Sequence, residues 1–300
     1  MNILITGVTG LLGKSLVEMN VFSHNITGIY LGKYKMANTK NLKYYCSDIQ
    51  DKNAMQKIFN ENNNIEVVIH TTGIADVDFC QQHYEEAYRS NVIGTQNIIE
   101  LCKETGARLL YVSTNAVFDG ENAPYREEDE PNPINNYGRI KLECEKRIRE
   151  TFNKYIIVRP ILMYGWNNPN ERKNLVTFLL DKLNKKERVN MVNDVYENPL
   201  SAYHCADVIL SLIDKDKHGI YHIAGKDIVN RYEYAIIIAD IFGLDKDLIR
   251  PVDSSFFPHI APRPKNTSYL TLKLEKELGF IPLGLRDGLI RMKGLRRDGN

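Results

Sequence analysis

Apolar and polar positions follow two alternating patterns through the first half of the chain. Short, continuously apolar runs such as "IEVVIH", "RLLYVS" and "YIIVRP" are typical of strands buried on both faces of a parallel sheet. Such runs predict strands over 2–6, 26–31, 42–46, 65–70, 107–113 and 154–159. Apolar residues spaced three or four positions apart predict helices over 11–20, 51–62, 81–103 and 134–152. This alternation predicts an α/β fold with a doubly wound parallel sheet.

The pattern becomes less regular after residue 160. Helices are predicted over 175–183, 205–214 and 231–243, the last ended by Gly243, and strands over 188–194 and 219–225. "APRP" (261–264) is predicted to be a rigid extended loop. We therefore expect a first domain over residues 1–160 and a smaller, mixed α/β lobe over 161–300, with some later segments returning to the first domain.

Three glycines occupy the predicted turn between the first strand and the first helix, in "MNILITGVTGLLGKSL". Glycine tolerates positive φ and lets the backbone approach a ligand closely. A helix N-terminus adds unpaired N–H groups and the positive end of the helix dipole. Gly7, Gly10 and Gly13 could therefore cradle a pyrophosphate, although similar glycines also occur in ordinary tight turns.

A second candidate site lies in "NNYGRIKLECEKRIRE", where Tyr137 and Lys141 are four residues apart and share one helix face. An ammonium group near a tyrosine lowers the tyrosine pKa, so such a pair can act as a general acid or base. The same spacing is also common on solvated helix faces. Thr114 ends a predicted central strand, where its hydroxyl could polarise a substrate carbonyl or cap the next turn.

The glycine turn, the strand-end hydroxyl and the Tyr-x-x-x-Lys pair occur in this order over 140 residues. In this the chain resembles the extended short-chain dehydrogenase/reductase family: "TGVTGLLG" is similar to its TGxxGxxG loop and "YGRIK" to its YxxxK site. The resemblance implies a Rossmann-like NAD(P)-binding domain over 1–160 and a mainly substrate-binding lobe over 161–300. It also implies that Tyr137 donates the proton, that Lys141 lowers its pKa and binds the nicotinamide ribose, and that Thr114 holds the carbonyl oxygen.

Further stretches resemble one group of this family, the dTDP-4-dehydrorhamnose reductases. "STNAVFDG" is similar to that group's STDYVFDG, and "APRPKNTSYLTLKLEKELGF" to its RPxxSxLxxxKLEKxLG. The resemblance implies reduction of the 4-keto group of a deoxysugar nucleotide. It implies substrate contacts from Val77, Asn115, Leu162, Met163 and Arg263. It implies cofactor contacts from Gly7, Thr9, Gly10, Leu11, Leu12, Gly13, Lys33, Asp48, Ile49, Thr71, Thr72, Gly73, Asn91, Tyr137 and Lys141.

Several positions depart from this group's pattern. Thr71-Thr72-Gly73 stands where the family commonly has Asn-Ala-Ala, and "RPILMYG" has Leu162 where the group has tryptophan. The group's DQxGxPT appears as "DVYENPL", and Asn115 stands where a dehydratase would need a carboxylate. These departures leave the sugar open. "RPILMYG" also resembles the regulatory subunit of methionine adenosyltransferase, so an NAD(P)-binding regulatory subunit is one alternative, and a sugar-nucleotide epimerase or dehydratase is another.

The segment after the second strand bears on the choice of cofactor. An acidic residue at the end of that strand holds the ribose 2′-hydroxyl of NAD in Rossmann-like folds. Here no Asp or Glu occurs from Met19 to Ser47, whereas Lys33 and Lys35 follow the strand and could attract a 2′-phosphate. We therefore expect NADPH, with NADH possible. The alternative is that these lysines are ordinary solvated charges.

Composition narrows the remaining possibilities. The formal net charge of +1 gives no indication of nucleic acid binding, and no apolar run approaches the roughly 20 residues that span a membrane. Five scattered cysteines without a CxxC motif, and no signal peptide, predict a cytoplasmic protein without disulfides or a metal site. His70, His204 and His222 are expected to be core or surface residues, and Glu143 and Glu145 to lie on a solvated helix face. A homodimer is a possible assembly.

Overall fold

The computed structural model describes residues 1–20, 24–32, 36–62, 64–168, 171–257 and 261–295. Lys33 and Lys35, on which the prediction of NADPH partly depends, lie outside these residues. Within them the central sheet has seven parallel strands, in the order β11-β6-β5-β4-β1-β2-β3. The strands are β1 (Asn2–Thr6), β2 (Asn25–Tyr30), β3 (Leu42–Cys46), β4 (Val67–His70), β5 (Arg108–Val112), β6 (Ile156–Pro160) and β11 (Gly219–Ile223). The predicted doubly wound α/β fold is confirmed.

Strand β1 lies at the centre of the sheet and pairs with β2 on one side and β4 on the other. The direction in which successive strands are added therefore reverses between β1 and β4, and this switch point is where ligands bind in such sheets. Burial of all four β4 residues explains its continuously apolar sequence up to His70. The loops that follow β1 and β4 are thus placed side by side at one edge.

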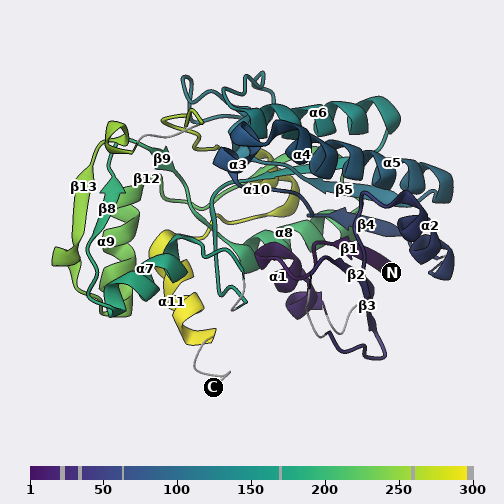
Figure 1. Ribbon diagram of the computed structural model, residues 1–300, viewed down its shortest axis with the longest axis horizontal. Helices are drawn as coiled ribbons and strands as arrows, with labels where there is room; N and C mark the ends of the chain where they lie inside the picture. The colour runs from purple at the N-terminus through teal and green to yellow at the C-terminus, as the bar shows by residue number, and fades with distance from the viewer. Residues whose placement is uncertain (21–23, 33–35, 63, 169–170, 258–260, 296–300) are drawn as a thin grey trace.

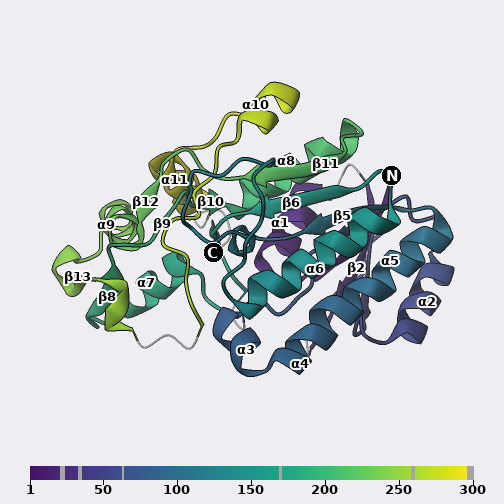
Figure 2. The same ribbon diagram turned by 90° about the horizontal axis from the view of Figure 1, so that it is seen from above.

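Helices cover both faces of this sheet. On one face, α1 (Leu11–Asn20) packs against α8 (Ala202–Asp214), over a core that includes Leu16 and Ile209. On the other face lie α2 (Lys52–Glu61), α5 (Gly94–Thr105) and α6 (Asn136–Thr151), which Figure 2 shows side by side. Although α8 and β11 come late in the sequence, they complete the layers formed by residues 1–160.

The helix predicted near 81–103 is confirmed from Tyr84 onward, but its start is wrong. The chain there forms α3 (Val77–Gln82), α4 (Tyr84–Tyr88), a π-helical turn (Arg89–Ile93) and only then α5. The break falls at His83, whose backbone is not helical (φ −122°, ψ 54°). Because the π turn inserts extra backbone into the helix, it changes the direction in which Asn91 faces.

The second lobe lies to the left in Figure 1 and has its own core, which includes Leu179, Ile238 and Leu289. Its helices are α7 (Leu175–Asn184), α9 (Arg231–Phe242) and α11 (Leu285–Leu295), while α10 (Leu272–Leu278) packs near β11. Two-stranded pairs join β7 (Met163–Tyr164) to β10 (Leu200–Ser201), β9 (Tyr196–Glu197) to β12 (Val229–Asn230), and β8 (Val189–Val192) to β13 (Ile249–Val252). Gly243 ends α9 in the left-handed conformation (φ 70°), as predicted.

Candidate active site

A cleft of about 1330 Å³ lies between the carboxyl edge of the central sheet and the second lobe. It brings together the three predicted catalytic residues and all five predicted substrate residues, from segments spread between positions 77 and 263. Of the predicted cofactor residues, those that line it are Thr9, Gly10, Leu11, Thr71, Gly73, Tyr137 and Lys141. The cleft is therefore at the sheet edge at which the sequence placed the site.

The glycine turn wraps tightly over the end of β1. Gly7 has a positive φ of 72°, and its N–H donates to the Ile29 carbonyl at 2.9 Å. A Cβ at Gly13 would lie 2.2 Å from the Gly7 carbonyl oxygen, so only glycine lets α1 pack this closely on the turn. Gly10 faces the cleft in front of the first turn of α1, whose N–H groups lack helical acceptors. This arrangement fits a dinucleotide pyrophosphate.

The threonines after β4 brace the glycine turn. The Thr71 hydroxyl donates to the Thr6 carbonyl at 2.7 Å, and the Thr72 N–H donates to the Thr6 hydroxyl at 3.3 Å. The Thr6 hydroxyl also lies 2.6 Å from Nδ1 of buried His70. Burial lowers the pKa of His70 to about 3, so the imidazole is a neutral core group.

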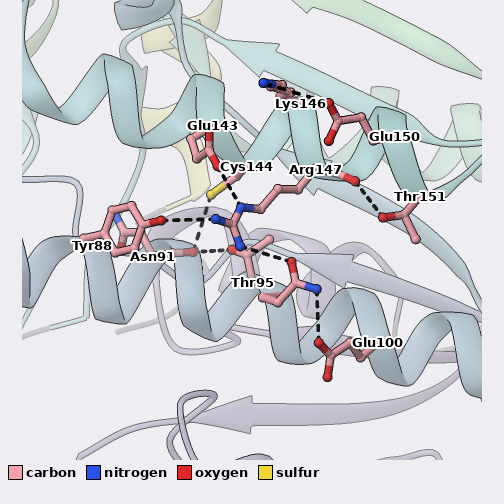
Figure 3. Close-up of polar contacts among 11 residues, drawn as sticks. Tyr88, Asn91, Thr95, Glu100, Glu143, Cys144, Lys146, Arg147, Glu150 and Thr151 are labelled. Carbon is pink, nitrogen blue, oxygen red and sulfur yellow. Dashed lines mark hydrogen bonds and ion pairs between the residues drawn. The ribbon is translucent and has the colours of Figure 1, made fainter.

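Asn91 holds the next part of the cleft wall. Its amide donates to the Ile74 carbonyl at 3.0 Å, and its oxygen accepts from the Ile74 N–H at 2.7 Å. As Figure 3 shows, its backbone carbonyl accepts from the Thr95 hydroxyl and from the Cys144 thiol of α6. Asn91 thus lies behind the wall and fixes Ile74, which lines the cleft.

Three other predicted cofactor residues, Leu12, Ile49 and Asp48, lie away from the cleft lining. Leu12 is buried in the core under α1. Ile49 is buried against Gly94, where a Cβ would come within 2.6 Å of Ile49 Cδ1. Asp48, after β3, accepts from the Gln50 N–H at 2.9 Å. Lys33 lies outside the described residues.

The start of α6 is fixed by its neighbours. The Asn135 side chain caps the helix by accepting from the Gly138 N–H at 2.9 Å. A Cβ at Gly138 would lie 2.1 Å from the Ala116 carbonyl oxygen, so this helix packs directly on the 3-10 turn (Asn115–Val117) after Thr114. This contact brings Thr114 and Tyr137 within hydrogen-bonding reach, and Thr114 also caps the 3-10 turn through Ala116 N–H.

The charges around Tyr137 differ from those predicted. Burial raises the pKa of Tyr137 to about 12, opposed by the Thr114 hydroxyl and by the charge of Arg172. Lys141 is not among the groups that shift this pKa, so its expected lowering of the Tyr137 pKa stays a prediction. The Lys141 ammonium instead donates to the Val112 carbonyl at 2.7 Å and lies 4.2 Å from the centre of the Tyr111 ring. Burial lowers the pKa of Lys141 to about 8.

A buried ion pair behind the site was not predicted. The side chains of Glu145 and Arg159 are each 1% exposed. The Glu145 carboxylate accepts two hydrogen bonds from the Arg159 guanidinium, at 2.9 and 2.7 Å. The Ser113 hydroxyl, beside Thr114, also donates to Glu145. The prediction that Glu145 lies on a solvated helix face is therefore wrong. The available signal was the arginine inside the apolar run "YIIVRP", because a buried cation needs a buried partner.

Charged residues also line the cleft. Arg263, in the extended loop before α10, pairs with Asp78 of α3 at 2.8 Å. Glu197 and Arg231 approach from the second lobe and pair at 2.6 Å. Within the described residues no group of three or more His, Cys, Asp or Glu side chains could hold a metal ion. In the same residues, no helix is long and apolar enough to cross a membrane.

The sheet, the glycine turn and the grouping of Thr114, Tyr137 and Lys141 at its edge define an extended short-chain dehydrogenase/reductase. Residues 1–293 match the sequence profile of the RmlD substrate binding domain family, and the chain belongs to this family. It is 32% identical to methionine adenosyltransferase 2 subunit beta from Bos taurus over 91% of this chain and 81% of that one. These matches leave two functional classes to be considered.

Solved structures give the same family. A dTDP-4-dehydrorhamnose reductase from Clostridium acetobutylicum ATCC 824 superposes with a TM-score of 0.85 at 31% identity, covering 99% of this chain and 100% of that one. The reductase from Bacillus anthracis str. Ames, solved in complex with NADP, gives a TM-score of 0.84 at 27% identity over 98% and 99% of the chains.

Proposed function

We propose that this protein is an NADPH-dependent reductase of the 4-keto group of a deoxysugar nucleotide. The observation that carries the proposal is the cleft in which Thr114, Tyr137 and Lys141 meet the glycine turn. The dTDP-4-dehydrorhamnose reductases of similar structure support it. Residues 1–160 would chiefly bind the cofactor, and 161–300 the sugar nucleotide.

Each catalytic side chain has a distinct task. Bound nicotinamide would supply a hydride to the carbonyl carbon. The Tyr137 hydroxyl gives its proton to the carbonyl oxygen, which becomes the alcohol, and afterwards regains a proton from water. A raised pKa keeps Tyr137 protonated before the reaction. Thr114 donates a hydrogen bond to the same oxygen, and the Lys141 ammonium places positive charge behind it.

Two observations favour NADPH over NADH. No Asp or Glu occurs from Met19 to Ser47, so no carboxylate from this segment could repel a 2′-phosphate at the end of β2. The Bacillus anthracis relative was solved with NADP.

The test is the oxidation of NADPH and of NADH, followed by absorbance, with a panel of 4-keto-deoxysugar nucleotides. We expect turnover of at least one panel member, and a loss of at least about a hundredfold in Tyr137→Phe, because general acid catalysis contributes that much. Tyr84→Phe, an exposed tyrosine of α4, is the matched control and should keep full activity. NADPH binding without reduction of any panel member would contradict the proposal.

A second candidate is a regulatory subunit that binds NADP and acts on a partner enzyme. The similarity to methionine adenosyltransferase 2 subunit beta, over 91% of the chain, favours it. Affinity purification of the tagged protein from its own cells would discriminate: a stoichiometric adenosyltransferase partner, together with no sugar-nucleotide turnover, would establish the second candidate.

A further inference from the structure

The Asn115 side chain is clamped from the second lobe. One hydrogen of its amide goes to Glu197 Oε1 at 3.0 Å, and another to the Thr267 hydroxyl at 2.7 Å. Because both amide hydrogens are used, the Asn115 oxygen is left facing Thr114, whose hydroxyl donates to it at 3.3 Å. Both Asn115 and Thr114 line the cleft.

Glu197 is itself fixed. It is 9% exposed, and its Oε2 lies 2.6 Å from Nη2 of Arg231 in an ion pair. Its position on β9, paired with β12 just before Arg231, holds both charges at the wall of the cleft. A glutamate held in this way remains a hydrogen-bond acceptor, so the amide of Asn115 cannot turn its oxygen toward it.

We propose that Glu197 determines specificity by fixing Asn115 as a hydrogen-bond acceptor toward the substrate. The inference rests on the proposed reductase function, in which Thr114 turns its hydroxyl proton to the carbonyl oxygen. The 3.3 Å contact from Thr114 to Asn115 is long, so exchanging it costs little. Once Thr114 turns, the Asn115 oxygen is free to accept from a sugar hydroxyl on the carbon next to the carbonyl.

The contact between the two side chains couples the two positions. Asn115 stands where the STDYVFDG pattern has Asp, and Glu197 where DQxGxPT has Gly. Two carboxylates here would face each other across the 3.0 Å that now separates the Asn115 amide nitrogen and the Glu197 oxygen. An amide at 115 is therefore compatible with a carboxylate at 197, whereas a carboxylate at 115 would be repelled by it.

The kinetic test compares kcat/KM for a 4-keto-6-deoxysugar nucleotide with that for its analogue lacking the neighbouring 3-hydroxyl. We expect the wild type to prefer the substrate with the 3-hydroxyl at least about tenfold, because one good hydrogen bond contributes a factor of this size. Glu197→Ala should lose this preference, and Glu197→Gln should keep it because its amide oxygen still accepts from Asn115. Glu187→Ala, which removes an exposed pair with Lys182 outside the cleft, is the matched control.

A swapped pair tests the contact itself. Asn115→Asp alone should lower the Tm, because two carboxylates would then face each other, and adding Glu197→Gln should restore it, because the hydrogen bond is then reversed. Full preference in Glu197→Ala, or equal loss in Glu197→Gln and Glu197→Ala, would overturn the proposal.

The Tm comparison does not depend on turnover. If no panel member is reduced, the proposed function is refuted, but the contact between Glu197 and Asn115 is not. The clamp is then judged by the Tm values alone, and additive effects of Asn115→Asp and Glu197→Gln would refute it.

Discussion

Replacing Glu145 by Leu would test how the active-site helix is held. Glu145 lies two turns after Tyr137 on α6, and both it and its partner Arg159 are 1% exposed. The substitution would leave the Arg159 guanidinium buried without its two hydrogen bonds of 2.9 and 2.7 Å. Removing one partner of a buried pair costs about 3–5 kcal/mol. At about 2 °C per kcal/mol for a chain of this length, the Tm would fall by about 6–10 °C.

The assay is urea unfolding followed by circular dichroism, together with thermal scans. The double variant Glu145→Leu with Arg159→Met should recover most of the loss, since both buried charges are removed together. Glu150→Ala is the control: its contact with Lys146, 3.9 Å long and exposed on the same helix (Figure 3), should be worth under about 0.5 kcal/mol. A Glu145→Leu protein as stable as the wild type, or a double variant that loses the sum of the single losses, would refute this reasoning.

Two further predictions concern the cofactor turn and the pH dependence of stability. Gly13→Ala would place a Cβ 2.2 Å from the Gly7 carbonyl oxygen and should weaken NADPH binding at least about tenfold by calorimetry; unchanged affinity would show that the turn can shift freely. His70 has a folded pKa of about 3, below its unfolded value, so its contribution to stability is present above pH 6.5 and is lost as the pH falls toward 3. Between these pH values His70 contributes about 1.4 kcal/mol per pH unit to the slope of the unfolding free energy against pH. In urea unfolding at pH 4–6, His70→Asn should lower the slope by this amount, and an unchanged slope would contradict the prediction.

The sequence predicted the central sheet well because buried parallel strands must be continuously apolar. The run "IEVVIH" could be placed for this reason, and β4 is buried throughout. The break at His83 could not be predicted in this way. The helical spacing of apolar residues continues across it, and this spacing carries no information about a change in backbone direction. Cys80 and Ala87 are both buried although they belong to different helices.

The sheet-edge site was found from short-range patterns, namely the glycine turn and the Tyr137–Lys141 spacing. Its electrostatics could not be found in this way. Lys141 was expected to act on Tyr137, but its ammonium is bound to the Val112 carbonyl of β5, a contact between segments 29 residues apart. Arg159 was visible inside an apolar strand, but only the folded chain shows that Glu145 is the residue that pairs with it.

Asn115 shows how a departure from a motif can mislead when it is considered alone. In the sequence, its amide argued against dehydratase chemistry because it removes a carboxylate beside Thr114. In the structure a carboxylate does lie beside Thr114 and Asn115, but it comes from Glu197, 82 residues further along the chain. Glu197 Oε1 accepts from the Asn115 amide at 3.0 Å. The carboxylate at this end of the cleft is therefore that of Glu197, which pairs with Arg231. Because the Arg231 guanidinium pairs with Glu197 Oε2 and the Asn115 amide donates to its Oε1, both carboxylate oxygens are engaged, so this group is better placed to orient its neighbours than to exchange protons, which favours reduction over dehydration.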